Sequence, residues 1–157
     1  MTRTLHIRGI VLLLGTTVGW VAHATVPAGA QLPLKAVERE FFKGGEAKRV
    51  KFVVADPEDV NDTSAIAKLA GCTIEGDAAF NPKTARLYVK RPTLTCPPDA
   101  KIGSNLLPGS DITGQLSDSG VDGIRLECTN PKECTVGRLK KGAEASFTVT
   151  ESLGGAD

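Results

Sequence analysis

Residues 71–96, with the sequence GCTIEGDAAFNPKTARLYVKRPTLTC, place the tightest constraint on the fold. The stretch has the pattern of two strands, one leading away from Cys72 and one returning through residues 86–90 with alternating side-chain character. Residues 81–83 (Asn-Pro-Lys) lie between them and are typical of a turn. Because a hairpin brings its two ends together, Cys72 and Cys96 are expected close enough to bridge. The stretch therefore predicts a stapled structural element, and it contains no catalytic group.

The N-terminal part of the chain has the pattern of a secretory signal peptide. Arg3 and Arg8 precede an apolar run over residues 9–20, and Ala22 and Ala24 supply the small residues that a signal peptidase reads. We expect cleavage after Ala24. The alternative is a retained membrane anchor, but the apolar run is shorter than the roughly 20 residues that a spanning helix needs.

Removal of residues 1–24 changes the chemistry available to the chain. Both histidines, His6 and His23, lie in this leader, so the mature chain has no imidazole for a Ser-His-Asp triad, a Cys-His pair or a histidine-ligated metal. We therefore expect no enzyme activity, no metal site and no cofactor. The leader also removes two of 19 basic residues, which leaves 17 against 18 acidic ones and a net charge near −1. This balance gives no electrostatic reason to expect direct nucleic-acid binding.

All four cysteines follow the leader, and export would place them in an oxidising compartment. An even number predicts two disulfides, with three connectivities open. Pairing Cys72 with Cys96 and Cys128 with Cys134 is favoured because each pair closes a local loop. A four-thiolate zinc site is the alternative, but the chain has no Cys-x-x-Cys pair.

Short strand patterns separated by turn signals run through the rest of the chain, and one helix is expected at 65–70 after the capping residues 61–64. The chain is therefore predicted to be mainly β: a single small β-barrel-like or sandwich-like domain with one short helix, stapled by two disulfides. Its predicted organisation is a cleaved signal peptide, an extended N-terminal segment, a β-rich periplasmic domain and a frayed tail, at residues 1–24, 25–34, 35–153 and 154–157.

Three segments of the hairpin resemble the C-terminal β-barrel domain of TraB-type (TraB/TrbI-like) scaffold proteins, which belong to conjugative type IV secretion machines. These segments are residues 72–76, 84–89 and 94–96. The family pattern has a cysteine that begins the hairpin, a glycine, an arginine that opens the returning strand and a closing cysteine, which correspond here to Cys72, Gly76, Arg86 and Cys96. Looser similarity extends the resemblance over most of residues 26–153, through residues 26–29, 109–114 and 142–153.

The resemblance implies a periplasmic β-barrel-like domain that joins a ring in the outer-membrane core complex. Its implied partners are an outer-membrane lipoprotein, a secretin-like ring protein and the scaffold. This chain departs from the family in having a cleavable leader in place of an inner-membrane helix and a proline-rich region. The family also inserts a pair of apolar helices where this chain has only the short loop from Cys128 to Cys134, and no apolar run in the mature chain is long enough to span a bilayer as a helix. A reduced relative is therefore expected.

Two functions of different class follow. The first is a structural subunit of an envelope-spanning secretion complex, outer-membrane associated, that works through exposed strand edges. The candidate edges are the strands 49–54 and 145–151, with Arg49, Val50, Phe52, Val54, Phe147 and Val149. The alternative is a free-standing, disulfide-stapled periplasmic binding or inhibitor domain that acts through a loop such as 97–108.

Overall fold

The structure, a computed structural model, describes residues 26–56, 64, 66–98 and 110–153. The predicted signal peptide, with Ala22 and Ala24, lies outside the described residues. The same holds for the predicted tail 154–157 and for most of the loop 97–108.

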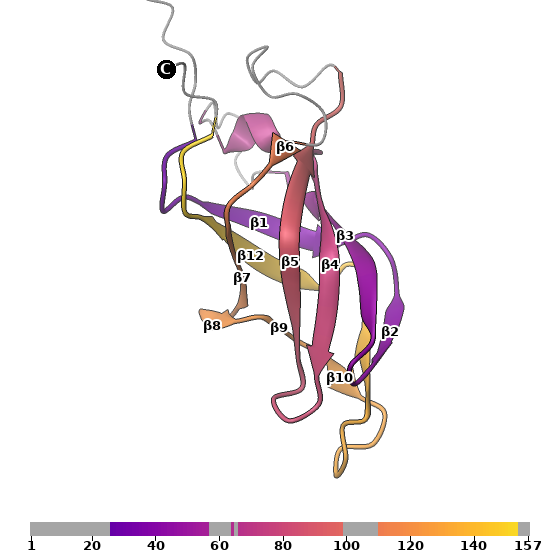
Figure 1. Ribbon diagram of the computed structural model, residues 1–157. Coiled ribbons are helices and arrows are strands. Elements are labelled where there is room, and N and C mark those ends of the chain that lie inside the picture. The colour runs from indigo at the N-terminus through magenta and orange to yellow at the C-terminus, as the bar shows by residue number, and fades with distance from the viewer. Residues whose placement is uncertain (1–25, 57–63, 65, 99–109, 154–157) are drawn as a thin grey trace, which may run out of the picture.

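The chain is mainly β, as predicted, and its strands form a nearly closed barrel (Figure 1). One sheet has the order β6-β5-β4-β3-β1-β12-β7-β8, with β9 paired to β5, and a second sheet has the order β10-β11-β2. A bridge between Ser117 and Gly123 brings the β8–β9 segment against β7 and so links it to both ends of the large sheet. The strands are β1 (Gln31–Ala36), β2 (Glu40–Lys43), β3 (Ala47–Val54), β4 (Thr73–Asn81), β5 (Arg86–Thr95), β6 (Ser110–Asp111), β7 (Gly114–Asp118), β8 (Val121–Asp122), β9 (Ile124–Arg125), β10 (Glu127–Cys128), β11 (Val136–Leu139) and β12 (Glu144–Val149).

The predicted hairpin is formed by β4 and β5. Asn81 begins the turn, and its side-chain Oδ1 accepts a hydrogen bond from the Lys83 N–H at 3.0 Å. The register shifts at Gly76, where two residue steps on β4 oppose three on β5, which is a β-bulge. A Cβ on Gly76 would lie 2.5 Å from Val89 Cγ1 and 2.9 Å from the Lys90 carbonyl oxygen. Glycine is therefore required at position 76, where β4 lies against the bulge in β5.

Two disulfides join the cysteines in the favoured pairing, Cys72 with Cys96 and Cys128 with Cys134. The first closes the open end of the β4–β5 hairpin, where Cys72 is fully buried in the core. The second closes the small loop between β10 and β11, with both cysteines partly exposed. The first disulfide therefore reaches into the core, whereas the second lies at the partly exposed margin of the core.

The helix is shorter than predicted. In place of a helix over residues 65–70, the structure forms a single 3-10 turn at Ala67–Leu69. Gly71 has a φ of +79°, its N–H donates to the Val54 carbonyl, and the Cys72 N–H donates to the Leu69 carbonyl. The chain has thus already returned to the sheet by Gly71, which leaves no room for further helical turns.

The sequence predicts an extended segment at 25–34 ahead of the domain, whereas its described residues, 26–34, are part of the barrel. Val26 is buried and bridges to Leu153, and β1 begins at Gln31 and pairs with both β12 and β3. The physical reason is the alternation of apolar residues, since Leu32 and Leu34 both point into the core.

The second sheet continues the pairing of β1 with β12 after a bend. The register is the same on both sides of the bend. Lys35 lies opposite Glu144, and Glu40, five residues after Lys35, lies opposite Leu139, five residues before Glu144. At the bend, the Gly142 N–H donates to the Ala36 carbonyl and Gly142 has a φ of +77°. The bend carries β2 and β11 over the turn end of the β4–β5 hairpin, where the core continues.

Candidate interaction surfaces

The strands predicted to be exposed edges lie in the interior of the large sheet, so that prediction is wrong. β3 pairs with β1 and β4, and β12 pairs with β1 and β7. The apolar side chains that suggested binding edges form the core face of these strands; they are Val50, Phe52, Val54, Phe147 and Val149. Arg49 points outward and pairs with Glu75 on β4. Alternation identified these segments as strands, but it does not reveal how many neighbours a strand has.

The outer edge of β2 is occupied by side chains and by its own turn. Lys48 Nζ donates to the Phe41 carbonyl at 2.9 Å, and the Lys43 N–H donates to Glu46 Oε2 at 3.4 Å. The Lys43 carbonyl accepts from the Glu46 N–H at 3.1 Å. Few main-chain groups of β2 are left for an added strand, although Phe41 is 49% exposed. This arrangement disfavours β-strand addition at β2.

Arg86 on β5 binds the backbone of the β8–β9 segment. Its Nη1 donates to the carbonyls of Val121 (3.2 Å), Asp122 (3.2 Å) and Gly123 (2.7 Å). Gly123 has a φ of +74°, and a Cβ there would lie 2.9 Å from the Leu87 carbonyl oxygen. One guanidinium and one glycine thus hold the segment that completes the barrel wall. The family pattern includes Arg86, but no local feature of the sequence indicates its contact with residues 121–123.

Replacing Arg86 by methionine is expected to lower the free energy of unfolding by about 1–2 kcal/mol, because hydrogen bonds from a charged donor to three carbonyls are lost. Arg86→Lys should recover only part of this loss, since an ammonium lacks the guanidinium fork. Urea unfolding measures the effect. The control is Arg39→Met, at an exposed position with no ion pair in the described part of the chain, and it should change stability by about 0.5 kcal/mol or less. Equal effects at the two positions would contradict the role of Arg86.

Glu75 lies on the outer face of β4 between two cations on β3. Lys51 Nζ is 2.8 Å from Glu75 Oε1, and Arg49 Nε is 3.3 Å from Glu75 Oε2. The hydrogen bond from Lys51 is the main cause that lowers the pKa of Glu75 below its ordinary value of 4.5, and both positive charges add to it. The carboxylate therefore contributes to stability in its ionised form.

This depressed pKa predicts a pH-dependent effect of Glu75→Gln. At neutral pH the substitution should cost about 0.5–1 kcal/mol, a small value because the pair is partly exposed. The cost should shrink as the pH falls through the lowered pKa of Glu75, since the wild-type carboxylate then becomes neutral too. Thermal unfolding from neutral to acidic pH measures this. For comparison, Glu133→Gln, at an exposed position with no ion pair in the described residues, should show no such trend. A constant difference at all pH values would refute the pairing.

A second carboxylate forms ion pairs in the three-stranded sheet, next to the Cys128–Cys134 disulfide. Glu127 on β10 pairs with Lys140 and Arg138. The hydrogen bonds from Lys140 and then Arg138 lower the pKa of the Glu127 carboxyl. These pairs fix β10 against β11 at the point where the Cys128–Cys134 loop begins.

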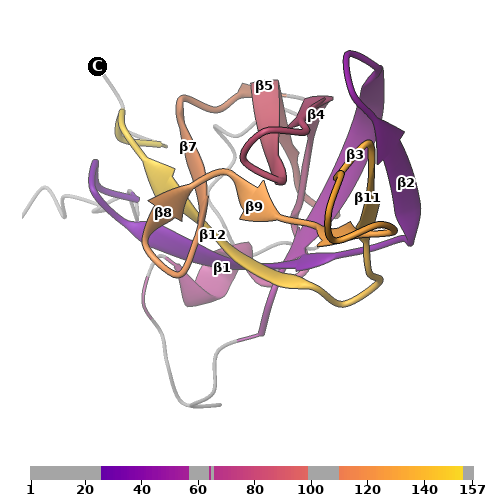
Figure 2. The same ribbon diagram turned by 90° about the horizontal axis from the view of Figure 1, so that it is seen from below.

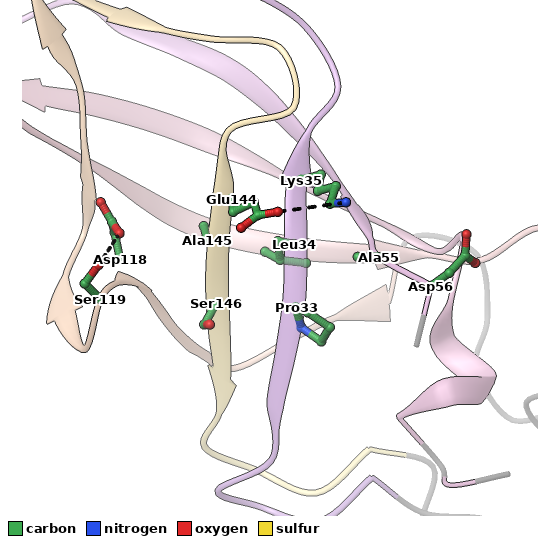
Figure 3. A pocket seen from close by; sticks show the side chains of 10 residues that line it. All are labelled: Pro33, Leu34, Lys35, Ala55, Asp56, Asp118, Ser119, Glu144, Ala145 and Ser146. Atoms are coloured by element: carbon green, nitrogen blue, oxygen red, sulfur yellow. Dashed lines mark hydrogen bonds and ion pairs between the residues drawn. The ribbon is translucent and has the colours of Figure 1, made fainter. Parts of the chain in front are cut away.

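An open groove crosses the outer face of β1 and β12 (Figure 3). It has a volume of about 530 Å³, and small side chains such as Pro33, Ala145 and Ser146 form part of its lining. Its charged residues are three carboxylates and one ammonium, with Lys35 Nζ 3.9 Å from Glu144 Oε1. We call this the acidic groove, and its carboxylates are Asp56, Asp118 and Glu144.

Cations gather on the outer face of β5 and β9, where Asp77 of β4 lies directly opposite Lys90. Arg86 and Arg125 lie directly opposite each other in the β5–β9 pair, and Tyr88 and Lys90 follow on the same face of β5. Within the described residues, none of these three cations has an ion pair with a carboxylate. We call this surface the basic face, defined by Arg86, Tyr88, Lys90 and Arg125.

No group of three or more His, Cys, Asp or Glu side chains with metal-binding geometry occurs in the described part of the chain. The helical residues within the described ranges include no segment of the length and hydropathy that a membrane-spanning helix needs. The absence of enzyme activity and of a cofactor stays a prediction.

No protein-family model matches this chain, and no curated protein matches it in sequence. Among solved structures, it is similar to ComB10 of the Com type IV secretion system of Helicobacter pylori. The TM-score is 0.42 with 11% sequence identity, over 83% of this chain and 90% of that chain. A likeness at this level supports no conclusion about a shared fold or function.

Proposed function

We propose that this protein is a non-catalytic, periplasmic structural subunit of a conjugative type IV secretion complex and contributes to its outer-membrane core ring. The observation that carries the proposal is the role of the four residues of the family pattern. Cys72 and Cys96 bridge the ends of the hairpin, Gly76 accommodates the β-bulge, and Arg86 completes the barrel wall. A resemblance carried by residues that build the domain supports a common architecture more strongly than scattered identities would.

The proposal includes export and the lack of catalysis. Two disulfides fit a protein that folds in an oxidising compartment, in agreement with the predicted leader. The non-catalytic assignment rests on the sequence, because both histidines lie in the leader. Direct nucleic-acid binding is not part of the proposed function, since the mature chain has a net charge near −1.

The proposed partners are an outer-membrane lipoprotein, a secretin-like ring protein and the scaffold of the complex. The manner of contact differs from the sequence-based expectation. Because β3 and β12 are interior strands and the edge of β2 is occupied, contacts are proposed to use side chains on the outer faces of the barrel. Surfaces of this kind form protein interfaces through aromatic and arginine side chains.

An affinity pull-down tests the proposal. The protein, tagged after its C-terminus, is recovered from the envelope of its native host after gentle crosslinking. We expect outer-membrane lipoprotein and secretin-like ring components in the recovered material, and their absence when an unrelated exported protein carries the same tag. Recovery of no envelope component, together with a monomer that binds a soluble periplasmic ligand, would instead identify a free-standing binding domain.

A further inference from the structure

The two disulfides differ in how readily an external thiolate could open them. A disulfide exchanges with a thiolate only where one sulfur can be reached and the other can leave as a thiolate. An attack on the partly exposed Cys96 would expel Cys72 as a thiolate in the apolar core, where Cys72 is fully buried. Cys128 and Cys134 are both partly exposed, so either sulfur can leave with contact to solvent. The Cys128–Cys134 bond therefore meets both conditions, and the Cys72–Cys96 bond does not.

Cys128 also lines an open groove, whereas Cys134 packs against the margin of the core. The groove has a volume of about 640 Å³ and lies beside β9, β10 and the loop between the two cysteines. Glu127, the nearest carboxylate in the sequence, is neutralised by Lys140 and Arg138 and so does not repel an incoming thiolate. Cys128 is therefore the sulfur that a bulky thiol can reach, and Cys134 is the leaving group.

The loop between these cysteines is held by hydrogen bonds that do not depend on the disulfide. The N–H and Oγ1 of Thr129 both donate to the Val136 carbonyl, at 3.1 and 3.0 Å. Within the loop, the Lys132 N–H donates to Asn130 Oδ1 at 3.0 Å, and β10 pairs with β11 at the base of the loop. Opening of the bond should therefore loosen the loop without separating the two strands. The two thiols should remain close enough to form the bond again.

We propose that the Cys128–Cys134 disulfide is a thiol–disulfide exchange site, which an exported protein with a Cys-x-x-Cys dithiol opens in the folded domain while the Cys72–Cys96 bond stays closed. One thiolate of the dithiol attacks Cys128 Sγ and forms a mixed disulfide, and Cys134 leaves as a thiolate and takes up a proton. The second thiol of the partner loses its proton, attacks the partner's own sulfur and releases Cys128. Two electrons thus pass from the dithiol to this bond, and the partner becomes a disulfide. The same steps in reverse close the bond, and the site does not depend on a place in a secretion complex.

Thiol labelling of the purified, folded protein tests the site. Reduced thioredoxin, a Cys-x-x-Cys dithiol protein, is added without denaturant, and the thiols are alkylated at intervals and assigned to each cysteine by mass spectrometry. Cys128 and Cys134 should become reactive at least about tenfold faster than Cys72 and Cys96, because exchange follows access to the sulfur and solvation of the leaving thiolate. A thioredoxin whose second active-site cysteine is replaced by serine should be trapped as a mixed disulfide on Cys128.

The matched control is Cys128→Ala with Cys134→Ala, which should trap no thioredoxin and keep its Cys72–Cys96 bond closed. Hydrogen exchange of the wild type with only the surface bond reduced should be faster at residues 129–135 and unchanged in the interior strands β1, β3 and β12. Circular dichroism establishes that the control is folded. If it is not, the order of labelling in the wild type still decides the question, because each cysteine is assigned separately.

Three results would overturn the inference: equal rates of opening for the two bonds, a trapped thioredoxin on no cysteine or on one other than Cys128, or loss of the folded core when only the surface bond is open. None of these results bears on the envelope pull-down, which tests the proposed function in the host. A protein that exchanges this bond but recovers no ring components would support the exchange site and refute the proposed function.

Discussion

Replacing Cys72 and Cys96 together by alanine is expected to lower the free energy of unfolding by about 3.5 kcal/mol. The bond closes a loop with a sequence separation of 24 residues, and the loss of this constraint lets the unfolded chain gain conformational entropy. Cys72 is fully buried, so alanine is used in preference to serine, which would bury an additional hydroxyl group. Guanidinium unfolding of the wild type and the variant measures the difference. For a domain with a typical stability of about 5–15 kcal/mol, this is a large share of the total.

The second disulfide provides the comparison. Cys128 and Cys134 are only six residues apart, so the same entropy argument gives about 2.2 kcal/mol for Cys128→Ala with Cys134→Ala. Both cysteines are partly exposed, and Cys134 packs only against the margin of the core, so their replacement should disturb the core less than that of the fully buried Cys72. The test therefore compares the two losses in the free energy of unfolding, and we expect the larger loss for the Cys72–Cys96 bond. If removal of the Cys128–Cys134 bond costs as much as removal of the hairpin bond, loop length does not govern their contributions.

The hairpin and both disulfides could be predicted because their causes are local. The turn residues 81–83 and the cysteines at the two ends of one short segment leave few other arrangements. A pairing between neighbours in the sequence needs no knowledge of the remaining strands. The Cys128–Cys134 pair is local in the same way, and its loop is shorter still.

The position of a strand within the sheet could not be predicted, because it depends on pairings between distant segments. β1 joins β12, which lies more than 100 residues later in the sequence, and this pairing makes both of them interior strands. The alternating apolar residues Leu32 and Leu34 were an available signal that this segment belongs to the core. Pro33 between them obscured that signal, because proline usually marks an edge or a loop.

The candidate surfaces were also hidden in the sequence. Lys90 and Arg125 are 35 positions apart, and Asp56 and Glu144 are farther apart still, so no local charge run reveals either patch. The pairing of Arg86 with Arg125 exists only because β9 returns to β5. The sequence showed a near-neutral chain, whereas the fold separates its charges into a basic face and an acidic groove.

Gly114, at the start of β7, is predicted to be the glycine at which an added methyl group costs most. A Cβ there would lie 2.3 Å from Phe147 Cε1 and 2.4 Å from the Thr148 carbonyl oxygen. The phenyl ring of Phe147, on the neighbouring strand, thus covers the bare backbone of Gly114, a recognised way of stabilising a glycine within a sheet. Gly114→Ala is expected to lower the free energy of unfolding by about 3 kcal/mol, because the ring and the backbone must both move.

A double-mutant cycle with Phe147→Leu separates the two contacts of Gly114. Phe147→Leu alone should cost about 1–2 kcal/mol as a change of shape in the core. Combined with Gly114→Ala, it should restore part of the loss by removing the ring from the new methyl group, while the contact with the Thr148 carbonyl remains. Gln115→Ala, at the exposed neighbouring position, should change stability by no more than about 0.5 kcal/mol. Strictly additive losses in the cycle would show that the ring does not restrict position 114, and that the strand shifts as a unit to accept the methyl group.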